Sequence, residues 1–304
     1  MIRSWIQLLV LLVVLTSISQ SQIKVTRSDK LALPRTQSWS HPQFSPAGAS
    51  VYFTNLEGNG IWEYSLKGRT TKQITADAKS GLAFSISSDG KSLVYRRTQQ
   101  DKSRSGRKQD IVLTNLTKRS ISILASGSDV SIPTFSNNTP VYSIRSQTVG
   151  LGKIAGKNEM TVLGIENTKI ALSVNGNKVL LDPLGNGSYI WPVLSPDKQQ
   201  LVAHDMGKGT FVCDLTGKVQ SMLGRRDAPS WTRSGKWIVY MEDKDDGHIL
   251  ISSDLFAVSS DGKTVVQLTS TSAVMEFDPR CSPTENKIIC SASDGAIMML
   301  EYEE

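Results

Sequence analysis

The sequence has few of the residues from which disulfide frameworks and metal centres are built. It contains three cysteines and three histidines in 304 residues. A small, odd number of cysteines is not typical of a disulfide-dense scaffold. The histidines, His41, His204 and His248, fall in three different units of the repeat described below, so they do not form the clustered ligand set of a metal site. We expect neither a metal site nor another cofactor.

Motifs of known catalytic machinery are also missing from the sequence. The chain has no Gly-x-Ser-x-Gly motif, which carries the nucleophile of α/β-hydrolases. The repeats described below leave no residues for a hydrolase domain, and the histidines are too dispersed for a lyase site built on clustered histidines. We therefore expect that the protein is not an enzyme.

The chain has little excess of charge of either sign. Lysine and arginine number 34 against 28 acidic residues, which gives a net charge of +6. Nucleic-acid binding requires a concentrated basic stripe. The basic cluster of this chain lies in a polar stretch that we interpret as a solvated loop, with a contact site for an anionic partner as the alternative. The cluster comprises Arg96, Arg97, Lys102, Arg104, Arg107 and Lys108. We expect no nucleic-acid partner.

Long apolar runs are missing except near the first residue. Arg3 precedes a nearly unbroken apolar run at 6–15, and small residues follow that run. This order predicts a signal peptide over residues 1–21, because the run is shorter than the roughly 20 apolar residues that cross a bilayer. An uncleaved anchor is the alternative. We expect a periplasmic or secreted protein with no stable membrane span after cleavage.

What the sequence does contain is an internal repeat. A proline, a variable residue, a bulky apolar residue and a serine or threonine occur in this order five times, and a sixth copy lacks the proline. We call the serine or threonine of each copy the anchor. The anchors are Ser45, Ser87, Ser136, Ser195, Thr232 and Ser282. Their mean spacing of about 47 residues is the length of one four-stranded propeller blade.

Turn residues follow most of the anchors, and β-branched or aromatic residues follow these, which is the pattern of a β-hairpin. After Ser45, for example, a turn at 46–48 leads into an apolar segment at 51–53, and a second hairpin begins at Ile61. Each unit therefore predicts four short antiparallel strands. The third unit is the least regular, and residues 147–167 read as an insertion.

Six such units predict an all-β fold, namely a six-bladed β-propeller of four-stranded antiparallel blades over residues 22–304. A two-sheet β-sandwich is the alternative, but sandwiches are not built from sequence repeats. The last unit stops after a third strand at 297–300, and a spare strand at 30–33 precedes the first anchor. We expect this N-terminal strand to pair with the last blade and close the ring.

Several segments match the consensus of one known repeat. They are Phe44-Ser45-Pro46-Ala47-Gly48, Leu194-Ser195-Pro196-Asp197, Asp254-Leu255-Phe256, Asp261-Gly262 and Gln267-Leu268-Thr269. Through them the chain resembles the TolB-like, WD40-like (PD40) propeller family over nearly all of residues 30–304. The resemblance implies a propeller and, because the family includes periplasmic TolB, a protein-binding role. TolB has a separate N-terminal domain for which this chain has no room, so we do not expect membership of the Tol system itself.

The register of the repeat locates a candidate binding mouth. The residues four positions before each anchor should ring one end of the central channel. They are His41, Ala83, Ile132, Trp191, Ala228 and Asp278, with Trp39, Asp227 and Glu276 close by in sequence. A mouth with aromatic and acidic groups suits a peptide or a glycan. The alternative is that the tryptophans pack between blades and the acids are solvated.

Two of the cysteines, Cys281 and Cys290, occupy apolar positions of the last repeat. Both should face the same side of one hairpin. They are therefore either buried free thiols or a cross-strand disulfide, which would add about 2–3 kcal/mol in the loop-entropy description.

Taken together, these patterns predict an exported β-propeller that acts as a non-catalytic protein-binding scaffold. The expected partner is another envelope or secreted protein. The alternative is a propeller that binds a glycan or a small ligand. An enzyme with its site at the channel mouth, using His41 or Asp278, is a third and weaker hypothesis.

Overall fold

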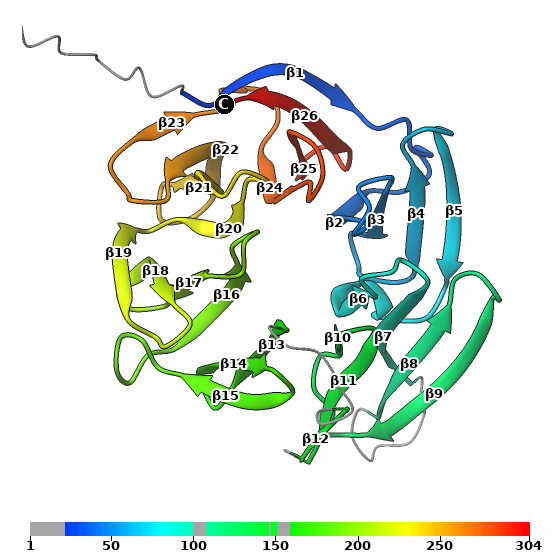
Figure 1. The fold of residues 1–304 in the computed structure, drawn as a ribbon. Coiled ribbons are helices and arrows are strands. Elements are labelled where there is room, and N and C mark those ends of the chain that lie inside the picture. The colour runs from blue at the N-terminus through cyan, green and yellow to red at the C-terminus, as the bar shows by residue number, and fades with distance from the viewer. Residues whose placement is uncertain (1–21, 100–107, 146, 151–158) are drawn as a thin grey trace, which may run out of the picture.

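Seven antiparallel sheets surround a central axis in the computed structural model of the chain (Figure 1). The structure describes residues 22–99, 108–145, 147–150 and 159–304. Five sheets have four strands and two have three. The protein is therefore an all-β, seven-bladed β-propeller. The predicted signal peptide, residues 1–21, lies outside the described residues, and among the residues described no helix is long and apolar enough to cross a membrane.

The first four blades follow one another along the chain. Blade 1 contains β2 (Trp39–Phe44), β3 (Ser50–Asn55), β4 (Ile61–Ser65) and β5 (Thr70–Thr75). The 3₁₀ helix η1 (Ser80–Leu82) leads into blade 2, which contains β6 (Phe84–Ile86), β7 (Ser92–Thr98), β8 (Gln109–Asn115) and β9 (Ser120–Gly127). Blade 3 contains β10 (Thr134–Ser136), β11 (Thr139–Ile144) and β12 (Gln147–Val149). Blade 4 contains β13 (Met160–Glu166), β14 (Lys169–Val174) and β15 (Asn177–Leu181).

The last three blades have four strands each. Blade 5 contains β16 (Tyr189–Leu194), β17 (Gln200–Asp205), β18 (Gly209–Asp214) and β19 (Val219–Gly224). Blade 6 contains β20 (Asp227–Trp231), β21 (Trp237–Asp245), β22 (Leu250–Ser259) and β23 (Val265–Gln267). Blade 7 contains β24 (Glu276–Cys281), β25 (Lys287–Ala292), β26 (Ile297–Glu303) and β1 (Lys24–Lys30).

The prediction of six blades was wrong because one blade has no anchor. The six anchors do end or directly follow the innermost strands of blades 1, 2, 3, 5, 6 and 7. Between Ser136 and Ser195, however, the chain builds two three-stranded blades and not one. Residues 147–167, interpreted as an insertion, supply β12 and the whole of β13.

In blades 1, 2, 5 and 6 the anchor hydroxyl closes the first hairpin of the blade by accepting a bond from the backbone nitrogen five residues later. In blade 2 the Ser87 nitrogen donates to the Ser92 oxygen (2.9 Å), and the Ser87 Oγ accepts from the Ser92 nitrogen (2.9 Å). Blade 5 repeats both bonds between Ser195 and Gln200. All six anchors are buried, and in these four blades a side chain that lacked a hydroxyl would leave a backbone donor unsatisfied.

Blade 4 differs from the other blades in strand direction. The anchor turns lie at one face of the ring, which we call the anchor face. The turn after β13 lies at the opposite face, because the Thr168 oxygen accepts a hydrogen bond from the nitrogen of Tyr189, where β16 begins (3.1 Å). We call this opposite face the mouth face. β13 therefore runs in the opposite direction to β10 and β16, the innermost strands on either side of it.

The ring is closed by the N-terminal strand, as the sequence predicts, but by a different segment. β1 pairs antiparallel with β26 from Lys24, opposite Glu303, to Lys30, opposite Met298. The predicted strand at 30–33 begins where β1 ends. Ile23, just before β1, is 1% exposed and packs in the cluster between blades 6 and 7. Closure therefore joins the two ends of the described chain through backbone pairing and an apolar contact.

The apolar core is divided among the junctions between blades. The cluster between blades 7 and 1, for instance, combines Phe53 of β3 with Ile289 of β25. A second one joins Val202 of β17 to Ile238 of β21 across blades 5 and 6. Because each blade packs on two neighbours, the strands near the axis are held in a fixed ring around the channel.

Candidate functional site

A bulge before proline shapes the innermost strand in four blades. The strand pairing shifts register around His41, Trp191, Ala228 and Asp278, each of which precedes a proline. Their φ angles are 51°, 51°, 50° and 52°. A left-handed backbone is unfavourable for residues with a Cβ, and bulges of this kind redirect side chains. The repeated proline therefore marks a bend of the channel wall.

The bulges frame a pocket of about 200 Å³ at one end of the channel. Four of the six predicted ring positions line it, namely His41, Ala83, Ile132 and Asp278. The remaining two lie away from it: Trp191 packs on His204, and Ala228 is fully buried. The structure thus brings four of the six ring positions together in one pocket, on the side of blades 1, 2, 3 and 7.

Two opposite charges stand side by side in this pocket. Asp278 and Arg280 are two residues apart on β24, and both line the pocket. Within the described residues neither side chain has a hydrogen bond or an ion pair. Burial lowers the pKa of Arg280, which the nearby Asp278 carboxylate partly offsets, but an arginine remains charged at any physiological pH. The pocket therefore presents an unpaired cation and an unpaired anion to whatever enters the channel.

His41 lies at the entrance with its side chain exposed. Its Nδ1 is 3.1 Å from the Ser40 Oγ, and its backbone nitrogen donates to the Ser291 Oγ of blade 7 (3.2 Å). These contacts fix the residue in position and leave its Nε2 without a hydrogen bond in the described structure. His41 can therefore donate to or accept from a bound group.

Three of the predicted mouth residues are structural. Trp39 is 3% exposed, packs edge-on against Phe53 and Trp62 at 5.0 Å, and donates from its Nε1 to the Pro34 oxygen. Asp227 is buried and accepts from the Arg225 Nε at 3.2 Å. The third, Glu276, is fully buried.

Trp191 is half-buried. Its ring meets that of His204 edge-on, with the centroids 5.6 Å apart. His204 Nδ1 in turn lies 2.8 Å from the Thr210 Oγ1 and 3.9 Å from an Asp227 oxygen. Trp191 therefore belongs to a side-chain network of blades 5 and 6.

A set of exposed apolar residues lies on the mouth face, and sequence reasoning had named only Ile132 among them. They are Leu56, Leu82, Ile132, Met206, Ile249 and Ile251, between 48% and 70% exposed. Leu82 and Ile132 also line the channel pocket. Met206 lies at the start of β16, where its nitrogen donates to Ser188, and Leu56 lies at the start of β2, where its nitrogen donates to Ser38. Leu56 and Met206 are single apolar residues inside polar turns of the sequence, and this was the only signal for them.

The anchor face is different in character. Its turns consist of segments such as Ser88-Asp89-Gly90, Asn137-Asn138 and Pro196-Asp197-Lys198, which are polar or small. No large hydrophobic residue in the described anchor turns is among the exposed ones. Among the described residues, the mouth face therefore carries exposed apolar side chains beside a pocket, whereas the anchor turns are polar or small.

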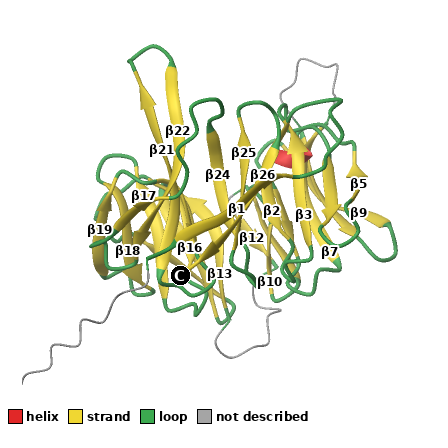
Figure 2. Ribbon diagram, turned by 90° about the horizontal axis from the view of Figure 1, so that it is seen from above, coloured by secondary structure: helices red, strands yellow, loops and turns green. Residues whose placement is uncertain are grey.

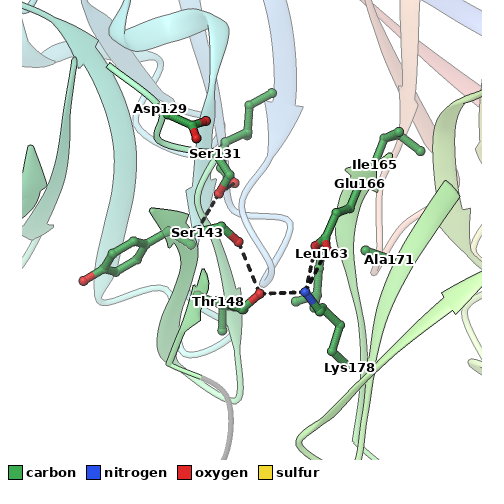
Figure 3. Close-up of a pocket in the computed structure, with 12 residues that line it drawn as sticks. Asp129, Ser131, Ser143, Thr148, Leu163, Ile165, Glu166, Ala171 and Lys178 are labelled. Carbon is green, nitrogen blue, oxygen red and sulfur yellow. Dashed lines mark hydrogen bonds and ion pairs between the residues drawn. The ribbon is translucent and has the colours of Figure 1, made fainter. Parts of the chain in front are cut away.

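A second pocket, of about 150 Å³, lies between blades 3 and 4 (Figure 3). The Lys178 ammonium reaches across it, 2.9 Å from both Glu166 oxygens and 3.0 Å from the Thr148 Oγ1. Because Lys178 pairs with Glu166 of its own blade and donates to Thr148 of blade 3, we interpret these three side chains as a bridge that holds the two three-stranded blades together.

The cysteines follow the free-thiol alternative. All three are free in the structure, and Cys281 and Cys290 both pack in the cluster between blades 6 and 7. Burial raises the pKa of Cys281 to about 12 and raises that of Cys290 as well. Across the described chain no three His, Cys, Asp or Glu side chains gather as metal ligands would.

Comparison with known proteins establishes the fold. No protein-family model matches the chain, and no curated protein sequence matches it. Among solved structures it is similar to the β-propeller domain of Cps50 (Swd1) from Myceliophteria thermophila, with a TM-score of 0.62, 9% identity and coverage of 92% of this chain and 99% of that one. An oligogalacturonate lyase in complex with manganese gives a TM-score of 0.51 and 11% identity over 86% of this chain and 76% of that one.

TolB from Acinetobacter baumannii is also similar in structure, with 16% identity and a TM-score of 0.49. The alignment covers 88% of this chain, which spans 56% of the TolB chain. The likenesses to the Cps50 domain and to the oligogalacturonate lyase show a β-propeller fold. The closer assignment to a TolB-like family stays a prediction, and so does the role that it implies.

Proposed function

We propose that the protein is a non-catalytic scaffold that binds another protein at its mouth face. One observation carries the proposal: the exposed apolar residues Leu82 and Ile132 line a pocket together with Asp278 and Arg280, whose side chains have no hydrogen bond or ion pair within the described residues. Protein interfaces combine an apolar contact area with a few charged groups that fix orientation. Leu82 and Ile132 would supply the contact area, and the two charged residues would receive a polar group of the partner.

The same proposal places the protein outside the cytoplasm. Its support is the order of residues at 1–21, which is that of a signal peptide. The partner would then be an envelope or secreted protein. N-terminal sequencing of protein recovered from the envelope or medium should begin close to residue 22; a start at Met1 in the cytoplasmic fraction would contradict export.

Site-specific cross-linking tests the binding face. A photoreactive amino acid would replace Leu82 or Ile132 on the mouth face, and Lys91 or Lys198 on the anchor face, in the protein of residues 22–304. After exposure to an envelope extract of the source organism, we expect one discrete adduct from the mouth positions and none from the anchor positions. Equal adducts from both faces would contradict the proposal.

A double substitution provides the matched control for the pocket charges. Asp278→Asn with Arg280→Gln removes both charges and keeps a polar side chain at each position. We expect the adduct at Ile132 to fall by about tenfold or more, since a charged hydrogen bond is worth about 1.5–3 kcal/mol. If the adduct is unchanged, the pocket is not the recognition element. Stabilisation of the protein by a glycan, with no protein adduct, would favour the glycan-binding alternative.

A further inference from the structure

Blade 7 differs from the other blades in the residues that it places along the channel. The pocket lining draws on two positions of the innermost strands, which lie four and two residues before the anchor. In the six blades that have an anchor, these positions hold His41 and Gln43, Ala83 and Ser85, Ile132 and Thr134, Trp191 and Val193, Ala228 and Ser230, and Asp278 and Arg280. Only the last pair contains a carboxylate or a guanidinium group. Since other side chains fill the same positions elsewhere in the repeat, the fold itself does not require these charges.

The two charges also have no partner inside the protein. Within the described residues, the side chains of Asp278 and Arg280 make no hydrogen bond and no ion pair, either with other groups or with each other. Both residues are half-buried. Moving a charge out of water without a partner is unfavourable, so an uncharged side chain would serve the fold better. A departure of this kind from the pattern of a repeat is typical of a functional site.

The two charged residues stand at different depths of the channel. β24 runs between the two faces of the ring (Figure 2), and the anchor Ser282 follows its last residue, so the strand runs from the mouth face to the anchor face. Two strand residues span up to about 6–7 Å. For a group that enters from the mouth, the backbone of Arg280 therefore lies deeper than that of Asp278. Gln43 lines the pocket at the equivalent position of blade 1. The deeper positions thus provide hydrogen-bond donors, and the acidic residue stands nearer the mouth.

The size and the walls of the pocket restrict what can reach these groups. Its volume of about 200 Å³ is smaller than that of a typical small-molecule site, roughly 300–1,000 Å³. Leu82, Phe84 and Ile132 contribute apolar side chains to its lining. A narrow pocket with a partly apolar wall and donor groups at its deeper positions suits the last residue of a polypeptide, whose side chain can contact the wall while its carboxylate meets the donors.

We propose that the channel pocket binds the free C-terminal carboxylate of a partner protein. Arg280 would bind this carboxylate through two parallel N–H···O bonds, the arrangement that favours arginine at carboxylate sites. Asp278 would face the segment one or two residues before the end and favour a lysine or arginine there. A chain that entered with its N-terminus first would bring an ammonium group towards the guanidinium, which is unfavourable. The inference rests on the proposed function and adds to it the chemical group of the partner that the pocket recognises.

Two pools of synthetic hexapeptides test the proposal. Both are random at the last four positions, and they differ only at the C-terminus, which is a free carboxylate in one pool and a carboxamide in the other. Each pool is passed over immobilised protein of residues 22–304, and the retained peptides are quantified by mass spectrometry. We expect the wild type to retain about tenfold more of the free-acid peptides at low salt. Peptides with an apolar last residue and a basic residue one or two positions earlier should be enriched.

Substitutions assign the effect to the two charges. Arg280→Gln should retain both pools alike, whereas Arg280→Lys, which keeps the charge without the planar fork, should keep part of the preference. Asp278→Asn should still prefer free acids but should lose the enrichment of basic residues. The matched control is Arg119→Gln, which changes an exposed arginine in the turn after β8. This variant should behave like the wild type.

The melting temperature separates recognition from a structural role. Because the charge of Arg280 has no partner within the described protein, Arg280→Gln should melt at or above the wild-type temperature. A clear fall would show that the fold uses the charge and would contradict the proposal. It would also be overturned by equal retention of the two pools by the wild type, by no retention of free-acid peptides, or by an unchanged preference in Arg280→Gln.

The cross-links at Leu82 and Ile132 distinguish this proposal from the proposed function. Adducts at these positions together with equal retention of the two peptide pools would support a protein partner at the mouth face and overturn recognition of a terminal carboxylate. Retention of free-acid peptides without any adduct from the envelope extract would support the carboxylate site and contradict an envelope protein as its partner.

Discussion

At the scale of single residues, Glu276 shows how a buried acid is accommodated. It has no exposed surface, and its oxygens lie 3.1 Å from Thr269 Oγ1 and 2.9 Å from Thr271 Oγ1. The Thr271 hydroxyl also donates to the Val274 oxygen at 2.6 Å, so its single proton has two competing acceptors. Burial raises the pKa of Glu276, with Asp254 acting in the same direction. A neutral carboxyl that donates to Thr271 would satisfy both oxygens.

Glu276→Gln is therefore expected to stabilise the protein at pH 7, by about 1 kcal/mol, because an amide can donate to Thr271 without a buried charge. Because the fold favours the neutral form of Glu276, this residue contributes to stability fully below the pKa of a glutamate in the unfolded chain, about 4.3. That contribution is lost as the pH rises through the higher pKa of Glu276 in the folded protein. The advantage of the variant should thus grow from pH 4 to pH 7. Melting temperatures measured from pH 4 to pH 7 test this expectation, with Glu57→Gln at an exposed position as the control. A Glu276→Gln variant that is less stable than the wild type at pH 7 would contradict it.

The thiols give a second prediction at this scale. Thiolates are the reactive species, and burial raises the pKa of both Cys213 and Cys281 to about 12. At pH 8 the thiols of the folded protein should react slowly with an aromatic disulfide reagent. The denatured protein should release three equivalents of the aromatic thiol per protein molecule at once. Fast labelling of the folded protein, or an intact mass two protons short of three thiols, would contradict the free and buried state.

At the scale of elements, sequence and structure agree wherever a local signal exists. The proline–anchor pattern identified six innermost strands because four of the anchors close a local hairpin and four of the prolines follow a bulge. β13 has no anchor, since it runs the other way and ends at the mouth face, and the seventh blade was missed for that reason. Trp39 was assigned to the mouth by position, but its side chain points to Phe53, which only the packing of blades reveals.

The bulges allow a paired test by glycine substitution. Ala228 has a φ of 50°, a left-handed backbone that costs a residue with a Cβ about 1–2 kcal/mol and that glycine adopts without this cost. Ala203 is equally buried but lies within β17, outside such a bulge, and serves as the control. Glycine otherwise costs about 0.5–1 kcal/mol in a strand. We expect Ala228→Gly to unfold at the same or higher denaturant concentration than wild type, and Ala203→Gly at a lower one. Equal losses in both variants would show that the bulge is not strained.

At the scale of the whole molecule, stability depends on how the ring is closed. Blade 7 is assembled from both ends of the described chain, with Lys24 opposite Glu303. Neighbouring blades are joined by a connecting loop, side-chain packing and single hydrogen bonds such as that from Tyr189 to Thr168, but no described strand of one blade pairs with a strand of another. A ring cut inside a blade can close by strand pairing, whereas a ring cut between blades has no strand pairing to close it.

Circular permutants test this difference. In both, a short linker would join residue 304 to residue 22. New ends between Thr216 and Gly217 would make β19 the first strand and β18 the last, which reproduces the native kind of closure. New ends between Arg225 and Arg226 fall between blades 5 and 6. We expect the first to melt near the wild-type temperature and the second at least about 4 °C lower, equivalent to 1–2 kcal/mol. Equal melting temperatures would contradict a role for strand closure.

The reversed direction of β13 has a consequence for recognition. Seven similar blades would give a partner on the axis seven nearly equivalent rotational settings, and binding energy would be shared among them. Blade 4 removes this equivalence. Its innermost strand ends at the mouth face, in the turn at Asn167 and Thr168, whereas the innermost strands of the other blades begin there. The mouth face therefore carries two features that no other blade repeats, the turn of blade 4 and the long β21–β22 hairpin of blade 6. Contacts with both would fix the rotation of a bound molecule about the axis. A partner can therefore be oriented as well as held.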